Sequence, residues 1–390
     1  MNAPYCTIVG LGFSDLSRAL AGSARELACT AVRRAVRDAG LTLADVDGLL
    51  INQSALAAAD TLPLGLHRDL GLGPLGLLAK LEGKGSSVIQ MLQYGAMSIA
   101  AGLAKVVVCV FADTPLAAGT ASGESYANAS TLTGVDGWEA QYGMFGPIAN
   151  HALLARRYLA RVGGDERNLA AYALACREWS AGNPLAFMRE QLTFDAYMDA
   201  RYIVAPFRLF DCAYPVNGGA AVVLTTLERA ADSPQPPVYV HGIGQGHTGV
   251  PMTRAADMQP GAGETTARGV FKTARVGPQD VTMCQFYDAF SISPMLALEA
   301  YGLCAAGEGA AFVLDGQTGP RGSLPTNTGG GQLASFYLQG MTPVSEAIIQ
   351  ARGNGGARQS ALNDLILVNG SGGCLEYQAA IAVSPWRSLG

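Results

Sequence analysis

The sequence predicts an α/β protein made of two similar halves, each with a β-α-β-α-β order of elements. Residues 38–51 align without a gap on residues 273–286. The apolar, helix-like stretch that ends at Gly102 matches a second one that ends at Gly353, and each leads into an apolar run typical of a strand. A duplicated unit of this kind predicts a pseudo-symmetric fold with a mainly parallel sheet.

The first half shows this alternation most clearly. Residues 24–40 are predicted to form an amphipathic helix, because their apolar side chains recur every three or four positions. Residues 86–102 are apolar on nearly all sides, which predicts a buried helix, and Val106–Phe111 is typical of a central strand. The remaining strands expected in this half are 5–10, 48–52 and 220–225.

The second half repeats the order after a proline-rich joint at Pro234–Pro237. Glycine clusters between its apolar runs indicate tight turns and close backbone approaches. The strands expected here are 237–243, 283–286, 365–369 and 376–383, and the expected helices are 264–274, 293–302 and 338–352.

One long stretch, residues 113–213, has no counterpart in the second half. It contains two helical patterns, at 148–162 and 165–180, and we interpret it as an inserted loop domain that covers the site. The expected organisation is an N-terminal half (1–112 and 214–232), the inserted loop domain (113–213) and a C-terminal half (233–390).

Composition narrows the functional classes. Hydrophobic residues make up 49% and charged residues 15% of the 390 positions, which indicates a well-buried globular protein. The net charge of −5 and the lack of a basic block argue against nucleic acid or anionic membrane as a partner. The eight cysteines contain no Cys-x-x-Cys pair, and neither a signal peptide nor a membrane span is apparent, so a cytoplasmic location is expected. The four histidines form no ligand cluster, so no metal is expected.

Symmetry also suggests a site. Counting back from the two matched glycines pairs Ser86 with Tyr337, both at expected helix starts after glycine-rich turns. Helix N-termini favour negative charge and offer free N–H groups, so two polar residues at paired helix starts are a site hypothesis.

Four segments resemble the thiolase family, and the resemblance spans nearly the whole chain. Tyr287–Phe290 resembles the Asn-Glu-Ala-Phe signature, and Leu324–Gly331 resembles the Asn-x-x-Gly-Gly that precedes the catalytic Gly-His-Pro. Val368–Gly373 resembles the glycine-rich loop of the second catalytic cysteine, and Asp211–Leu224 resembles the segment entering the last strand of the first half. The resemblance implies the thiolase fold, with two pseudo-symmetric halves in a five-layer arrangement, and a homodimer.

The residues that carry thiolase chemistry are replaced. The resemblance puts the nucleophilic cysteine near Gly85 or Ser86, the histidine at Tyr337, the second cysteine near Asn369 or Gly370, and the asparagine at Tyr287. A Claisen condensation needs a thiolate to hold the acyl group and a base to form a carbanion. Thiolytic cleavage is therefore not expected.

One thiolase-fold group has similar replacements, the lipid-transfer-protein-type aldolases that shorten steroid side chains. Their Tyr-Asp-x-Phe and Gly-Gly-x-Leu-x-x-x-Tyr segments are similar to Tyr287–Phe290 and Gly330–Tyr337. The resemblance implies a lyase that cleaves a β-hydroxyacyl-CoA, with a steroid side chain as the expected acyl group, to a ketone and a short acyl-CoA. It also implies no permanently bound cofactor, coenzyme A brought by the substrate, and a separate OB-fold subunit, often zinc-bearing, in a heterotetramer.

Retro-aldol cleavage needs a base for the β-hydroxyl proton and an acid for the α-carbon. A helix dipole would lower the pKa of Tyr337, and Tyr287, beside Asp288, would supply an acid or an enolate hydrogen bond. The sequence leaves open which tyrosine is the base. The expected catalytic residues are Tyr287, Tyr337 and Asp288, and the expected oxyanion or substrate-positioning residues are Gly85, Ser86, Asn369, Gly370 and Gly372.

Structural roles compete with these assignments. Most tyrosines pack in the core, Ser86 would serve equally as a helix N-cap, and Asp288 as a cap or ion-pair partner. Two other functions stay open. The first is an acyltransferase or residual thiolase that is acylated on Ser86 or Cys374, and the second is a non-catalytic scaffold that assembles with an OB-fold partner.

Overall fold

The computed structural model describes residues 3–19, 22–52, 62–116, 126, 134–254 and 261–389. Within these residues, a nine-stranded sheet has the order β3-β2-β4-β7-β1-β8-β11-β10-β9. Its strands are β1 (Cys6–Phe13), β2 (Gly48–Asn52), β3 (Leu77–Lys80), β4 (Val106–Asp113), β7 (Gly218–Thr225), β8 (Val238–His247), β9 (Met283–Gln285), β10 (Ile366–Gly372) and β11 (Tyr377–Ser384).

The strand order repeats on the two sides of the junction between β1 and β8. Read outward from that junction, β1-β7-β4-β2 corresponds to β8-β11-β10-β9. The aligned segments 38–51 and 273–286 end in or just beyond β2 and β9, which are equivalent in this order. The two matched apolar runs become the equivalent strands β4 and β10. The prediction of two pseudo-symmetric halves is confirmed.

The prediction of a mainly parallel sheet is wrong for neighbouring strands. Among the described pairs of the nine-stranded sheet, β2 is parallel to β3 and β4, and β9 to β10, whereas the other five pairs are antiparallel. The antiparallel pairs arise because the last strand of each half, β7 or β11, runs against its neighbours. β7 is inserted between β1 and β4, and β11 follows β10 through a turn too short for a parallel crossover.

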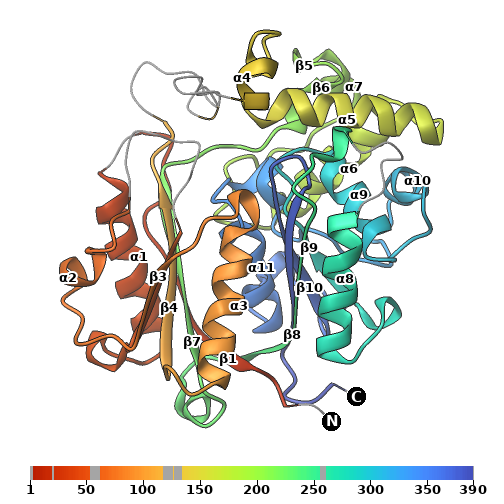
Figure 1. The fold of residues 1–390 in the computed structure, drawn as a ribbon. Coiled ribbons are helices and arrows are strands. Elements are labelled where there is room, and N and C mark those ends of the chain that lie inside the picture. The colour runs from red at the N-terminus through yellow and green to blue at the C-terminus, as the bar shows by residue number, and fades with distance from the viewer. Residues whose placement is uncertain are drawn as a thin grey trace.

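Helices complete a five-layer arrangement (Figure 1). α1 (Ala24–Asp38) covers the outer face of the first half-sheet and α8 (Gly261–Ala274) that of the second, while α3 (Ser87–Ala100) and α11 (Met341–Ala351) lie between the two. α1 buries only its apolar face, whereas α3 and α11 are buried nearly all round and share one core cluster with strands of both halves.

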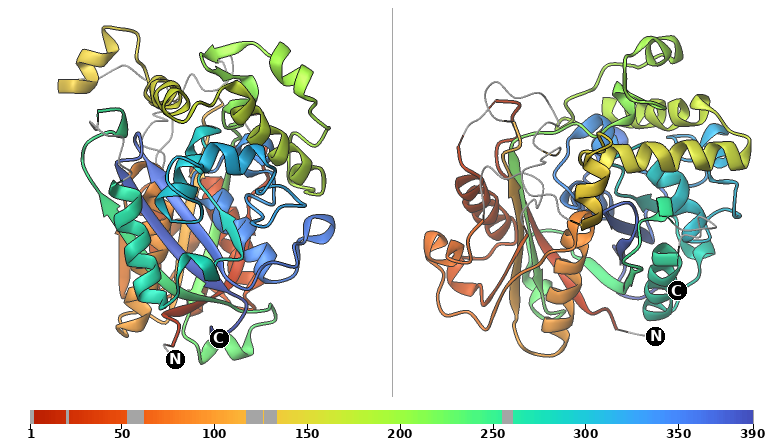
Figure 2. Two further views of the ribbon diagram at one scale, coloured as in Figure 1. Left: turned by 90° about the vertical axis from the view of Figure 1, so that its right-hand side faces the viewer. Right: turned by 45° about the horizontal axis from the view of Figure 1, so that its top comes forward.

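The described residues between β4 and β7 lie over one end of the sheet (Figure 2). Its two long helices, α5 (Pro147–Val162) and α6 (Glu166–Ala181), match the predicted ranges closely. They share a core cluster with α9 (Ile292–Ala300) and with Phe286. The shorter elements of this stretch are α4 (Gly134–Ala140), α7 (Phe194–Asp199), β5 (Tyr202–Val204) and β6 (Phe207–Arg208).

Several short elements gave no periodic signal in the sequence: α2 (Leu66–Leu70), β3, α10 (Gly309–Leu314) and a π-helical turn at Gly331–Ser335. No helix in the described part of the chain has the length and apolar character needed to cross a membrane.

Candidate active site

The hydroxyl groups of Tyr287 and Tyr337 are hydrogen-bonded to each other at 2.7 Å. Their rings meet edge to face, with centroids 6.2 Å apart, and each residue is 9% exposed. Tyr287 follows β9, and Tyr337 lies in the segment between the π-helical turn and α11. The fold thus brings together the two tyrosines that the sequence singled out.

Two residues fix the position of Tyr287. Its backbone N–H donates to Oδ1 of Asn369 at 2.8 Å, so Asn369 orients the start of this segment from β10. A Cβ added at Gly85 would lie 2.6 Å from Cζ and 2.8 Å from the hydroxyl oxygen of Tyr287. Gly85, one of the two positions near which the resemblance puts the thiolase nucleophile, therefore makes room for the phenol.

Tyr337 is held in an extended segment before α11. Its N–H donates to the carbonyl of Tyr214 at 2.8 Å, and α11 begins only at Met341. The prediction that Tyr337 opens a helix, and that the helix dipole lowers its pKa, is wrong. Burial raises the pKa of Tyr337 well above its usual value, and nearby Tyr287 and Tyr126 add to the rise. Burial also raises the pKa of Tyr287, so both phenols are protonated at neutral pH.

Asp288 is fully buried, and its described hydrogen bonds go to residues other than Tyr287 and Tyr337. Oδ1 accepts from the N–H of Gln332 at 2.8 Å, and Oδ2 accepts from the hydroxyl of Tyr172 at 3.2 Å. Burial raises the pKa of Asp288 to about 7, against the lowering effect of these hydrogen bonds. These contacts support an anchoring role for Asp288 at the turn leading to Tyr337, and its predicted catalytic role stays a prediction.

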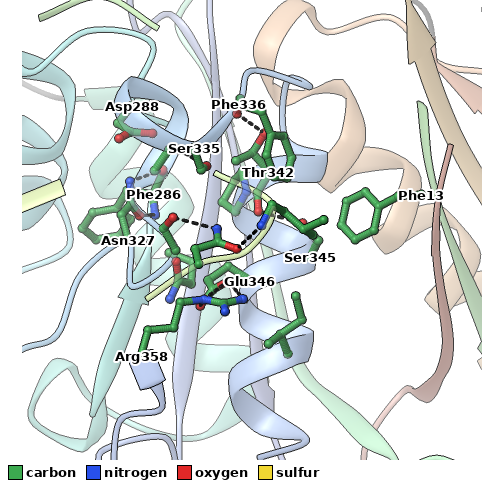
Figure 3. Close-up of a pocket in the computed structure, with 17 residues that line it drawn as sticks. Phe13, Phe286, Asp288, Asn327, Ser335, Phe336, Thr342, Ser345, Glu346 and Arg358 are labelled. Atoms are coloured by element: carbon green, nitrogen blue, oxygen red, sulfur yellow. Dashed lines mark hydrogen bonds and ion pairs between the residues drawn. The ribbon is translucent and has the colours of Figure 1, made fainter. Parts of the chain in front are cut away.

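A buried ion pair supports the same region from below (Figure 3). Arg358 Nη2 lies 3.0 Å from Glu346 Oε2, and Glu346 Oε1 accepts from the hydroxyl of Thr328 at 2.9 Å. The pair ties α11 to the loop that contains Asn327, whose side chain in turn bonds both backbone groups of Phe286. The segments carrying the two tyrosines are thus fixed to each other.

Ser86 is not brought to the tyrosine pair as a reactive group. Its hydroxyl donates to the carbonyl of Gly83 at 2.7 Å and accepts from Nε2 of Gln90 at 2.8 Å. Its backbone N–H donates to the same Gly83 carbonyl, so it is unavailable for the oxyanion hole that we predicted there. Ser86 shapes the turn before α3.

The predicted glycines of β10 allow close packing. A Cβ at Gly370 would lie 3.0 Å from the carbonyl oxygen of Gly85, and one at Gly372 would overlap the carbonyl oxygen of Gly83. Their strand pairs with β11 along its length. Both glycines therefore bring β10 against the turn that contains Gly85, and their contacts give no evidence of oxyanion binding.

The two phenols open into a cavity of about 210 Å³. Ser86 and Asp288 are not among its described lining residues, whereas Gly85 is. The lining also includes residues that the sequence did not single out for a catalytic site, in particular Tyr126, His151 and Gln339.

His151, on α5, contributes a neutral imidazole to this cavity. Its Nδ1 lies 2.9 Å from the carbonyl of Pro147, one helical turn earlier, so Nδ1 carries the proton and Nε2 is an acceptor. Burial lowers the pKa of His151 to about 4. The sequence suggested no role for the histidines other than metal binding. The described residues hold no cluster of metal-ligand side chains. The position of His151 in a predicted helix over the site was the available signal.

Tyr126 is a third phenol near the pair, and it is partly buried. Its ring packs edge-on against Tyr337, with centroids 5.6 Å apart, and its hydroxyl donates to Oδ2 of Asp113 at 3.3 Å. No periodic pattern surrounds Tyr126 in the sequence, and only the fold brings it to the pair.

The five-layer architecture with doubled halves is the thiolase fold, and a family model described as thiolase C-terminal domain-like matches residues 244–384. A 17-hydroxy-3-oxo-4-pregnene-20-carboxyl-CoA lyase from Mycobacterium tuberculosis is 32% identical over 382 residues, covering 95% of this chain and 98% of the relative. A steroid side-chain-cleaving aldolase from Thermomonospora curvata is 30% identical over 385 residues, covering 94% of this chain and 95% of the relative.

Among solved structures, an Ltp2-ChsH2(DUF35) aldolase superposes with a TM-score of 0.88 at 30% identity, covering 98% of each chain. The chain belongs to the thiolase-fold family of side-chain-cleaving aldolases, which are carbon–carbon lyases acting on CoA thioesters.

Proposed function

We propose that this protein cleaves a β-hydroxyacyl-CoA by a retro-aldol reaction, giving a ketone and a short acyl-CoA. The observation that carries the proposal is the hydrogen-bonded pair of Tyr287 and Tyr337 in the cavity, where the family resemblance puts thiolase catalytic groups. The names of the two relatives support a steroid side chain as the acyl group.

The protonation state of the pair suggests how it works. Because both phenols have raised pKa values, a resting phenolate is not required in the mechanism that we propose. The β-hydroxyl proton passes to one phenol oxygen as that phenol passes its own proton to the second. In the same concerted step, the electron pair of the O–H bond forms the C=O bond of the ketone and the pair of the breaking Cα–Cβ bond goes to Cα. The second phenol gives its own proton to Cα as it accepts the proton of the first phenol. Protons balance, and both tyrosines end neutral.

The acyltransferase alternative has less support. The hydroxyl of Ser86 is engaged, as donor and as acceptor, by Gly83 and Gln90 in its own turn. Cys374 lines the cavity, but burial and nearby Glu376 raise the pKa of its thiol to about 12, so it is not a thiolate at neutral pH. Neither side chain is an activated nucleophile.

Assembly with other chains is part of the proposal. The solved Ltp2-ChsH2(DUF35) aldolase supports a separate partner subunit, which we expect to be an OB-fold protein in a heterotetramer. Exposed apolar side chains in the first half, Leu78 on β3 and Met97 on α3, each more than one-third exposed, support a homodimer through this half. We further propose that the insertion, residues 113–213, shapes specificity, because α5 supplies His151 to the cavity.

The test uses the chain with and without its DUF35 partner, incubated with a steroid β-hydroxyacyl-CoA bearing a tertiary hydroxyl. Mass spectrometry follows the ketone and the short acyl-CoA. We expect both products without free CoA, and their loss in Tyr337→Phe. Cleavage that requires free CoA would indicate thiolysis and refute the proposal. A stable complex with no cleavage by the wild type would favour the scaffold alternative.

A further inference from the structure

Two buried serines beside Tyr287 have hydroxyl groups that make no hydrogen bond to the described residues. Ser293, on α9, is 5% exposed, and Ser371, on β10, is 9% exposed. The described hydrogen bonds of both residues involve their backbones alone. Neither hydroxyl oxygen is among the described unpartnered polar atoms that solvent cannot reach, so each keeps surface that a bound molecule can contact. A molecule that accepts a hydrogen bond from them removes the cost of leaving them unpaired.

Both serines line two spaces at once. One is the cavity of about 210 Å³ into which the phenols open, and the other is a small pocket of about 10 Å³. Tyr287, Ser293 and Ser371 are the described residues that line both, so they form the boundary between the cavity and the pocket. The pocket has room for about one oxygen-sized group. A group that enters it from the side of the phenols passes between the two hydroxyls.

The geometry of β10 explains why Ser371 faces this boundary. Side chains alternate between the two faces of a strand, so residues 369 and 371 point the same way. Asn369 uses its side chain to accept from the N–H of Tyr287 at 2.8 Å. Ser371 is directed to the same side, and its backbone lies against Gly85, where an added Cβ would be 2.0 Å from the Ser371 carbonyl oxygen.

The proposed reaction supplies the acceptor that the two hydroxyls lack. When the Cα–Cβ bond breaks, its electron pair goes to Cα and is shared with the thioester carbonyl oxygen. That oxygen has two lone pairs and no proton, so it accepts from two hydroxyl donors. Donors held where negative charge develops lower the barrier of the reaction. Ser293 also lies in the first turn of α9, the end of a helix that favours negative charge.

We propose that the hydroxyls of Ser293 and Ser371 bind the thioester oxygen of the substrate and stabilise the negative charge that it gains during cleavage. The inference rests on the proposed retro-aldol function and adds two catalytic residues to it. Both serines donate hydrogen bonds only, so no covalent bond forms between them and the acyl group. The β-hydroxyl is then held by the phenols and the thioester oxygen by the serines.

The first measurement is of binding without cleavage. Propionyl-CoA has a thioester oxygen but no β-hydroxyl, and S-propyl-CoA lacks that oxygen as well, so neither is cleaved. Calorimetry compares the two ligands in the wild type, in Ser293→Ala, in Ser371→Ala and in the double variant. Ser98→Ala is the matched control, because the Ser98 hydroxyl is also buried without a partner but lies on α3, outside the described lining of both spaces.

We expect the wild type and Ser98→Ala to bind propionyl-CoA about tenfold more tightly than S-propyl-CoA. Each single variant should lose part of this preference and the double variant all of it, with unchanged affinity for S-propyl-CoA. In the cleavage assay, kcat should fall by about 10²-fold in each single variant. Ser371→Thr, which keeps the hydroxyl, should retain most of the activity. The melting temperatures of the alanine variants should be no lower than that of the wild type, because the hydroxyls removed had no partner.

An unchanged kcat in the double variant would overturn the inference, whatever its melting temperature. So would an equal loss of affinity for both ligands, since that would indicate a contact with the part of CoA that they share. The two proposals fail in different ways. A wild type that shows the serine-dependent preference but cleaves no steroid thioester refutes the retro-aldol function, whereas a wild type that cleaves no faster than the double variant's own rate refutes the role of the serines.

Discussion

The phenol of Tyr287 occupies the space that a side chain at Gly85 would need. A Cβ there would lie 2.6 Å from Cζ of Tyr287, and 2.0 Å from the carbonyl oxygen of Ser371. The absence of a side chain at position 85 and the large side chain at position 287 are therefore coupled, because the phenol of Tyr287 has room only beside a glycine.

Gly85→Ala should consequently displace Tyr287 and slow turnover by at least about two orders of magnitude. The added methyl group should also destabilise the protein by about 1–3 kcal/mol, because it overfills a packed region. Steady-state kinetics and thermal unfolding measure both effects. Gly73→Ala is the matched control, since a Cβ there meets nothing within 4 Å and should change neither quantity. Full activity in Gly85→Ala would contradict the coupling of the two positions.

Phe replacements test whether Tyr287 and Tyr337 act as a unit. Each of Tyr287→Phe and Tyr337→Phe should slow turnover by about 10²–10⁴-fold, the usual contribution of a general acid or base. The double variant should be little worse than either single one, because removing one hydroxyl already breaks the proton relay. Tyr94→Phe changes an exposed ring and should leave the turnover rate unchanged. Effects that multiply in the double variant would indicate two independent groups.

The turnover rate should not depend on pH between about pH 7 and 9. Burial raises the pKa of both phenols above the usual value of about 10, so neither loses its proton in this range. A rate that rises with a midpoint near pH 8, and loses that rise in Tyr337→Phe, would point to a working phenolate and to the lowered pKa that the structure does not support.

Asp288→Asn should separate anchoring from catalysis. The amide oxygen can still accept from the Gln332 N–H, so the turnover rate should stay within about tenfold of the wild type. The pKa of Asp288 rises from 3.8 unfolded to about 7 folded, so the folded state holds a proton that the unfolded state releases between these pH values. Its contribution to stability is therefore largest below pH 3.8 and is lost as the pH rises towards 7.

Denaturant unfolding at several pH values measures this contribution as the difference between wild type and Asp288→Asn. Between about pH 4 and 7, the free energy of unfolding of the wild type should fall by a few kcal/mol relative to that of Asp288→Asn. A folded Asp288→Asn variant whose turnover is slowed by about three orders of magnitude or more would instead restore the catalytic role predicted from the sequence.

His151 should make the stability of the fold depend on pH in the opposite direction to Asp288. Its pKa falls from 6.5 unfolded to about 4 folded, so the unfolded state binds a proton first as the pH is lowered. Stability should therefore decrease by about 3 kcal/mol between pH 6.5 and 4, and His151→Gln should remove that slope. If the free energies of unfolding of the wild type and of His151→Gln changed with pH in the same way, His151 would be accessible and would titrate normally.

The sequence determined the elements and their symmetry. Periodicity placed α1, α3, α5 and α6 within a few residues, because the pattern of buried faces is written locally along a helix. The duplication matched β2 with β9 and β4 with β10, and the family resemblance selected the two tyrosines that the fold brings together.

Tertiary structure decided what those residues can do. Strand direction in β7 and β11, the orientation of Asp288 and the hydrogen bonds of Ser86 depend on which segments meet in space. The raised pKa of Tyr337 depends on desolvation and on Tyr287, Tyr126 and Asp113, which are far from it in the chain. Local patterns encode which faces are buried, but partners and desolvation arise only when distant segments pack together.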